Sequence, residues 1–171
     1  MKRLLIFPAI VFFLTCGLKA QSLNRFFQKY DDDNRFESVS VGKFLFNLAL
    51  LSNDIKGEER ELLANLRKVK ILTTNENAQP EFTSKVMRDL QKVIENGDFE
   101  NLVEVREKGE RVNIYTRMNG DCFTDLLIEV KDATEINLIW INGKLSRNII
   151  EKLQNNNNNS TLSNLPINLK L

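Results

Sequence analysis

The chain has 171 residues, and its 24 basic and 23 acidic side chains give a formal net charge of +1. It contains no histidine, which removes the commonest general base, the commonest metal ligand and the usual partner of a catalytic serine or cysteine. The near-balance of charges also excludes the basic footprint on which nucleic-acid binding usually depends, so we predict no nucleic-acid partner.

The first twenty residues have the pattern of a secretory signal peptide. Lys2 and Arg3 precede an apolar run over 4–14, and Ala20 supplies a small residue at the boundary. The run is shorter than a membrane-spanning helix requires, so we expect cleavage after Ala20. The protein is therefore expected to be exported, to the periplasm or to the extracellular space.

Cys16 offers an alternative, because lipidation after cleavage just ahead of it would anchor the protein to a membrane. The preceding Phe13-Leu14-Thr15 matches the usual small-residue pattern poorly, so a soluble product is preferred. Loss of residues 1–20 removes three basic side chains and leaves 21 against 23 acidic ones. Cys122 is then the one remaining cysteine, which excludes an internal disulfide.

The first half of the remaining chain predicts helices with two strands between them. Apolar residues recur at spacings of three and four in the helices and alternate in the strands. Residues 43–51 are apolar nearly all round, which predicts a buried helix, whereas Pro80 and Gly97 bound the most regular helix. The expected segments are a helix over 22–30, a polar turn over 31–34, a strand over 36–41, helices over 43–51 and 58–67, a strand over 69–73 and a helix over 80–94.

From Asn101 onward, apolar residues recur at every second position, as in a strand, and no longer at the spacing of a helix. Short turns separate the apolar runs, which predicts an antiparallel meander. Asn142-Gly143 is expected to end the last strand, Ser146 to cap a final helix, and the Asn-rich residues 155–171 to be disordered. The four strands are expected over 102–107, 111–118, 122–130 and 135–142.

The turn after the second of these strands decides which side chains share a face. A three-residue loop, Met118-Asn119-Gly120 with a left-handed Gly120, places Cys122 opposite Thr116. A two-residue loop would mix polar and apolar residues on both faces, so the longer loop is preferred. It collects apolar side chains on one face (Val112, Ile114, Leu126, Ile128, Val130) and polar ones on the other (Arg111, Asn113, Arg117, Asp125, Glu129).

These elements predict an α+β fold in a single domain over 21–154. The fold is expected to hold a C-terminal four-stranded antiparallel meander, N-terminal helices with one or two further strands, and helices packed on one sheet face. The signal peptide over 1–20 and the tail over 155–171 lie outside this domain.

No catalytic, cofactor-binding or metal-binding set is apparent in the sequence. The run over 31–33 is not an EF-hand, because Phe36 stands where the loop needs glycine. Cys122 has no histidine to activate it, and paired carboxylates such as Asp121 and Asp125 arise by chance in an acid-rich strand. We therefore predict that the protein is not an enzyme and takes no cofactor.

The polar face of the meander is the candidate binding surface. It combines guanidinium groups with aromatic rings, which are enriched at recognition surfaces. The alternative is an ordinary solvated face or one covered by a helix. The candidate residues are Arg106, Arg111, Tyr115, Arg117 and Phe123.

Several fold-marking segments are shared with a known family, namely Phe36–Phe46, Val69–Leu72, Leu102–Gly109, Val112–Tyr115 and Leu138–Gly143. From about Phe26 to Leu153, nearly the whole mature domain, the chain resembles a family of small exported proteins of Gram-negative bacteria, a domain of unknown function. The resemblance implies an exported α+β domain and supplies no catalytic residues.

The sequence therefore predicts a non-enzymatic binding or accessory module of the bacterial envelope. Its expected partner is an envelope protein or a small ligand, with membrane contact only if Cys16 is lipidated. Two alternatives remain open at this point. One is a hydrolase that uses carboxylates alone, and the other is a purely structural component of the envelope.

Overall fold

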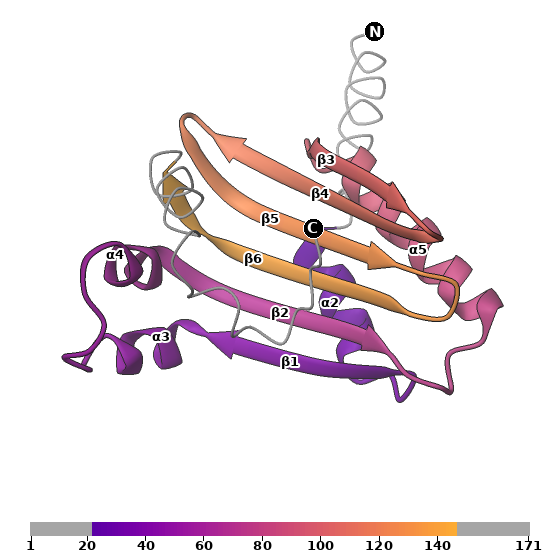
Figure 1. The fold of residues 1–171 in the computed structure, drawn as a ribbon, viewed down its shortest axis with the longest axis horizontal. Coiled ribbons are helices and arrows are strands. Elements are labelled where there is room, and N and C mark those ends of the chain that lie inside the picture. Colours follow the sequence, from indigo (N-terminus) through magenta and orange to yellow (C-terminus); the bar gives the residue numbers. More distant parts are fainter. Residues whose placement is uncertain (1–21, 147–171) are drawn as a thin grey trace, which may run out of the picture.

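The computed structural model describes residues 22–146, which form four helices and one six-stranded antiparallel sheet (Figure 1). The strand order is β1-β2-β6-β5-β4-β3, so the last strand lies between β2 and β5. The elements are α2 (Leu23–Asp31), β1 (Phe36–Gly42), α3 (Lys43–Ala49), α4 (Gly57–Asn65), β2 (Leu66–Thr74), α5 (Pro80–Glu95), β3 (Glu100–Glu107), β4 (Glu110–Asn119), β5 (Cys122–Lys131) and β6 (Ile136–Ser146). The predicted α+β class and the C-terminal meander are confirmed.

Four of the expectations fall on residues that the structure does not describe. The signal peptide, lipidation of Cys16, the helix expected after Ser146 and the Asn-rich tail all lie outside residues 22–146.

Helices α2 and α5 lie together on one face of the sheet (Figure 1). The Ser22 hydroxyl caps α2 by accepting the backbone N–H of Arg25, and Pro80 occupies the first turn of α5, where its missing N–H costs nothing. Each helix turns one apolar stripe toward the strands. The buried core consists of Leu23, Phe26, Phe27, Tyr30, Phe36, Leu72, Phe82, Val86, Leu90, Val93, Ile94, Leu127, Ile136, Leu138 and Trp140.

Helices α3 and α4 pack instead at one end of the sheet, where they form a second, smaller core. Phe46 is the buried side chain of α3, and it clusters with Leu66 and Leu145. Half-buried side chains complete this core: Val41, Leu62, Leu63, Val69, Phe123 and Ile141. Val69 and Ile141 pair with one another and point away from α2 and α5, so this core lies on the opposite face.

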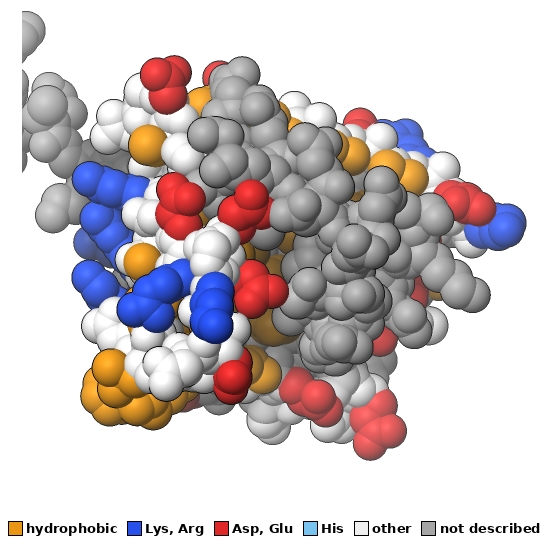
Figure 2. Space-filling model, turned by 60° about the vertical axis from the view of Figure 1, so that its left-hand side comes forward, with side chains coloured by type: hydrophobic (Ala, Val, Ile, Leu, Met, Phe, Trp, Pro, Cys, Tyr) orange, Lys and Arg blue, Asp and Glu red, His pale blue; other side chains and the backbone are white. Residues whose placement is uncertain are grey.

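The prediction that 43–51 forms a buried helix is wrong as to burial. Phe44 and Leu51 are 77% and 78% exposed, and Leu45 and Leu48 are 50% and 53% exposed. A short helix at the end of a sheet can bury only one of its sides, and Phe46 occupies that side. Hydrophobic side chains accordingly gather low on the end of the molecule where α3 lies, with Lys and Arg side chains above them (Figure 2).

The predicted end of the last strand is also wrong, because β6 continues through Gly143 to Ser146. Leu145 and Ser146 pair with Phe123 and Cys122, and Gly143 pairs with Leu66 at a register shift in β2. At this point a Cβ on Gly143 would lie 2.6 Å from the Asn65 carbonyl oxygen. Glycine therefore permits the close approach of β6 to the end of α4.

Replacement of Gly143 by alanine is expected to lower the free energy of unfolding by about 2 kcal/mol, because backbone has to move to admit the methyl group. Urea titration followed by circular dichroism measures this loss. Gly42→Ala is the matched control, since no atom lies within 4 Å of its Cβ position. Equal stability of the two variants would show that the crowding at Gly143 is without consequence.

The predicted register of the β4–β5 hairpin is wrong, and Cys122 and Phe123 lie on the faces opposite to those predicted, but the sorting of faces from Asp125 onward is confirmed. Gly120 is left-handed, with φ +60°, but the loop has two residues and joins Asn119 to Cys122. A bulge at Thr124 then shifts the pairing, so that Thr116 faces Leu126 and not Cys122. Beyond the bulge, the pairing differs from the predicted register by an even number of residues. Every side chain beyond the bulge therefore stays on its predicted face.

Candidate functional site

The polar face of the meander, the candidate surface in the sequence, is the face on which α2 and α5 pack. Tyr115 is half-buried against the main core. The side chain of Arg117 is turned toward a buried carboxylate, that of Asp125, and its guanidinium carbon lies 5.1 Å from the ring of Phe99. Both residues therefore have partners within the chain.

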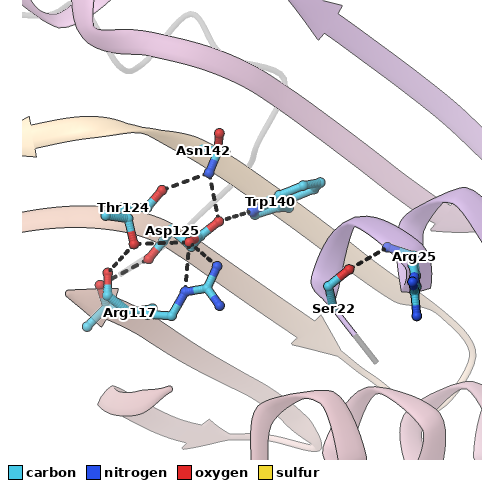
Figure 3. Close-up of polar contacts among 8 residues, drawn as sticks. Ser22, Arg25, Arg117, Thr124, Asp125, Trp140 and Asn142 are labelled. Carbon is cyan, nitrogen blue, oxygen red and sulfur yellow. Dashed lines mark hydrogen bonds and ion pairs between the residues drawn. The ribbon is translucent and has the colours of Figure 1, made fainter. Parts of the chain in front are cut away.

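Asp125 is the centre of a buried polar network (Figure 3). Arg117 donates to Oδ2 from Nε at 3.0 Å and from Nη2 at 2.6 Å. The Trp140 indole N–H and the Asn142 amide each donate to Oδ1 at 2.9 Å, and the Thr124 hydroxyl donates to Oδ2 at 3.1 Å. Every donor comes from β4, β5 or β6, so the network holds three neighbouring strands together.

The hydrogen bonds and charges of this network favour the ionised form of the Asp125 carboxylate. Burial by itself would raise the pKa of Asp125, but the hydrogen bonds from Arg117, Asn142 and Trp140 outweigh it and hold the pKa below its usual value. A general acid or base needs a pKa near the working pH, so Asp125 has the properties of a structural anchor.

Glu129 is the other buried carboxylate of this face. It accepts one hydrogen bond, from the Asn113 amide at 3.3 Å. Burial raises its pKa, and it also raises the pKa of the nearby Tyr115 hydroxyl. Neither group lines the polar pocket at the far end of β1 and β2.

The remaining candidate residues are not brought together with Tyr115 and Arg117. Arg106 and Arg111 pair with one another at the exposed edge formed by β3, and Arg106 also makes an ion pair with Glu104. Phe123 directly precedes the bulge at Thr124 and packs in the second core, on the opposite side of the sheet. The five predicted residues thus occupy three different environments.

The open pocket is a polar hollow of about 640 Å³ at the far end of β1 and β2. It is lined by Glu37, Thr73, Thr74, Asn75, Glu76, Asn77, Thr134 and Glu135. Across residues 22–146, no group of three or more acidic or cysteine side chains is placed to hold a metal ion. Cys122 is half-buried opposite Asn119 and Ser146, so it has a different partner from the one predicted.

The exposed side of α3 is a surface that sequence reasoning missed. We call Phe44, Leu45 and Leu48 on α3, together with Leu51 in the turn that follows it, the α3 ridge. Arg60 lies beside it, because its guanidinium donates to the Leu50 carbonyl at 2.7 Å. The spacing of residues 44, 48 and 51 was the available signal, since i, i+4 and i+7 define one side of a helix.

No helix within the described part of the chain is both long enough and apolar enough to cross a bilayer.

Comparison with known families found one match. The model of a family described as Domain of unknown function (DUF4252) matches residues 30–153. The resemblance to a domain of unknown function over most of the chain is thereby confirmed. Comparison with curated proteins and with solved structures found no match.

Proposed function

The chain belongs to the family described as Domain of unknown function (DUF4252), and on that premise we propose that it is a non-enzymatic, exported binding module that engages a protein partner through the α3 ridge. The observation that carries the proposal is the exposure of four large apolar side chains on one short helix and the turn that follows it. Contiguous apolar side chains of this kind on a folded surface commonly mark a contact with another molecule.

The ridge has the geometry of a helix that inserts into a groove. Phe44 and Leu48 stand at i and i+4 on α3, the spacing at which helical anchors enter an apolar groove, and Leu51 follows in the turn after Ala49. Phe46, on the other side of α3, packs in the second core and fixes the orientation of the ridge. The anchors are therefore held in place before a partner arrives, which reduces the entropy cost of binding.

The charges beside the α3 ridge indicate which charged groups surround the partner's groove. Lys43 at its start and Arg60 near its end are both exposed basic side chains. A groove with apolar walls and carboxylates at its rim would complement this arrangement. The engagement of Asp125 by four donors also supports a binding role over the carboxylate-based hydrolase.

A triple substitution of the ridge tests the proposal. Phe44→Ser/Leu48→Ser/Leu51→Ser in the mature chain is expected to abolish capture of one stoichiometric protein from native envelope extract, with the tag placed ahead of Ser22. The captured protein is then purified, and calorimetry is expected to show at least a hundredfold weaker binding to the triple variant, as loss of central anchors predicts. Melting temperature is expected to change little, because the three positions are exposed.

Leu102→Ser is the matched control, since Leu102 is an exposed apolar residue on β3, remote from α3 in the sheet order. It should bind the partner as the unaltered chain does. Equal binding by the triple variant would overturn the proposal. Loss of vesicle binding in the triple variant, with no protein captured by the unaltered chain, would replace it with a contact to lipid.

A further inference from the structure

The face of the sheet that points away from α2 and α5 carries an apolar row across all six strands. Successive pairings place Val39 beside Ile71, Ile71 beside Ile139, Ile139 beside Ile128, Ile128 beside Ile114 and Ile114 beside Val103. We call these six residues the apolar row. Every member is β-branched, and each lies directly opposite its neighbours, as side chains on one face of a sheet do.

Adjacent positions enlarge the row into an apolar face. Val112, Val130 and Val105 flank it on one side, and Leu126 flanks it on the other. The described helices reach this face only at the second core, through Val41, Val69 and Ile141. Antiparallel sheets with one wet face normally place polar side chains on it, so a face this apolar indicates a covering.

We propose that the C-terminal residues 147–171 of this same chain fold back across the apolar row and cover it. The first argument is position, because the chain leaves the sheet at Ser146, the end of β6, which lies between β2 and β5. The segment therefore begins at the end of a strand that is central in the sheet, with strands of the apolar row on either side of it.

The second argument is reach. Twenty-five residues follow Ser146. Strands in a sheet are about 4.8 Å apart, so the six strands span about 24 Å. An extended chain advances about 3.3 Å per residue, so even the final seven residues can cross most of the sheet.

The third argument is the pattern of the segment. Leu165, Ile167, Leu169 and Leu171 alternate with Pro, Asn and Lys, which gives the end of the chain one apolar side when it is extended. Nearer to β6, Ile149, Ile150 and Leu153 have helical spacing. The family match also continues to residue 153, seven residues beyond β6.

Disulfide trapping in the full mature chain tests the proposal. In a Cys122→Ser background, Ile167→Cys is combined in turn with Ile71→Cys, Ile128→Cys or Ile114→Cys, each a half-buried member of the apolar row. With oxidised glutathione, at least one pair is expected to close within a single chain about tenfold faster than a control, because docking raises the local thiol concentration. The control combines Ile167→Cys with Gln91→Cys, on the exposed side of α5.

Equal closing rates for the row and the control would overturn the proposal, as would disulfides found only between two chains, which would assign the face to a second copy. A second measurement does not depend on cysteine substitutions in the apolar row. Leu165→Ser/Ile167→Ser/Leu169→Ser is expected to raise binding of the dye ANS several-fold, because the apolar face becomes accessible. Asn156→Ser/Asn157→Ser/Asn158→Ser is the matched control, and an equal effect of the two triple variants would also contradict docking.

Discussion

Replacement of Asp125 by alanine is expected to lower the free energy of unfolding at pH 7 by about 3 kcal/mol, one of the two largest effects of any single change proposed for this chain. The Asp125 side chain is 1% exposed and accepts hydrogen bonds from Arg117, Thr124, Trp140 and Asn142. Its loss leaves the Trp140 indole N–H without its acceptor and the Asn142 amide with only the Thr124 carbonyl, whereas Arg117, partly exposed, can still reach water. Urea titration followed by the fluorescence of the single tryptophan measures the effect.

Asp121→Ala is the control for this variant. Asp121 is an exposed carboxylate in the turn between β4 and β5, so its removal is expected to cost less than about 0.5 kcal/mol. A loss of similar size in both variants would mean that charge in this hairpin matters, and that the buried network does not.

The effect of Asp125 should also depend on pH. Its pKa is lower in the folded protein than the ordinary value of 3.8, so the folded state favours the ionised form. The resulting stabilisation is present above the unfolded pKa and is lost as pH falls through the folded pKa. The difference in stability between the unaltered chain and Asp125→Ala should be constant from pH 7 to pH 5 and should shrink at lower pH. A difference that persists unchanged in strong acid would contradict this account.

Replacement of Phe27 by alanine is expected to cost about 3–4 kcal/mol, because it empties the centre of the main core. Phe27 is 0% exposed, and its ring lies 5.4 Å from that of Trp140 and 5.7 Å from that of Phe26, centre to centre. Such aromatic pairs contribute beyond the area that they bury. Calorimetry or urea titration would detect the loss as a lower melting temperature or midpoint.

Phe44→Ala provides the same chemical change in a different environment. Phe44 is 77% exposed on α3, so its truncation is expected to alter the free energy of unfolding by less than about 0.5 kcal/mol. A large loss in this variant would show that the α3 ridge is covered in solution.

Helices α2 and α5 and the meander could be predicted from sequence because the apolar residues of each recur at a regular spacing. In α2 and α5 the apolar residues repeat on one side, and Ser22 and Pro80 mark the first turns. Beyond residue 101 the alternation of side chains and the short turns specify neighbouring strands. These signals are local, so they can be recognised without knowledge of the rest of the fold.

The exposure of α3 could not be predicted, because burial depends on where a helix lies. The composition of 43–51 is that of a core helix, and only the position of α3 at the end of the sheet leaves Phe44 and Leu51 in water. The β4–β5 register was missed for a related reason. Beyond Thr124, a two-residue loop with a bulge gives the same sorting of faces as a three-residue loop. The alternation of polar and apolar residues there cannot distinguish the two loops.

Sequence could not decide whether the polar face of the meander is exposed or covered, because it does not show which face of the sheet the helices pack on. Trp140 and Leu138 on β6 draw α2 and α5 to that side, and polar residues of β4 and β5 are buried with them. The partners of Asp125 include Trp140 and Asn142, which become its neighbours only through the pairing of β5 with β6. The sequence therefore leaves open whether Tyr115 and Arg117 are exposed or covered, and in the structure both lie on the face that the helices cover.

The central place of the final strand has a consequence for the synthesis of the protein. Until Ile136–Ser146 has left the ribosome, the β1–β2 pair and the β3–β5 sheet are separate pieces, and both β2 and β5 keep an unpaired edge. Pairing of Val69 with Ile141 then closes a loop that contains α5 and most of the meander, a slow, long-range step. A chain cut short before β6 therefore loses the middle of its sheet and keeps two open edges that can pair with other chains.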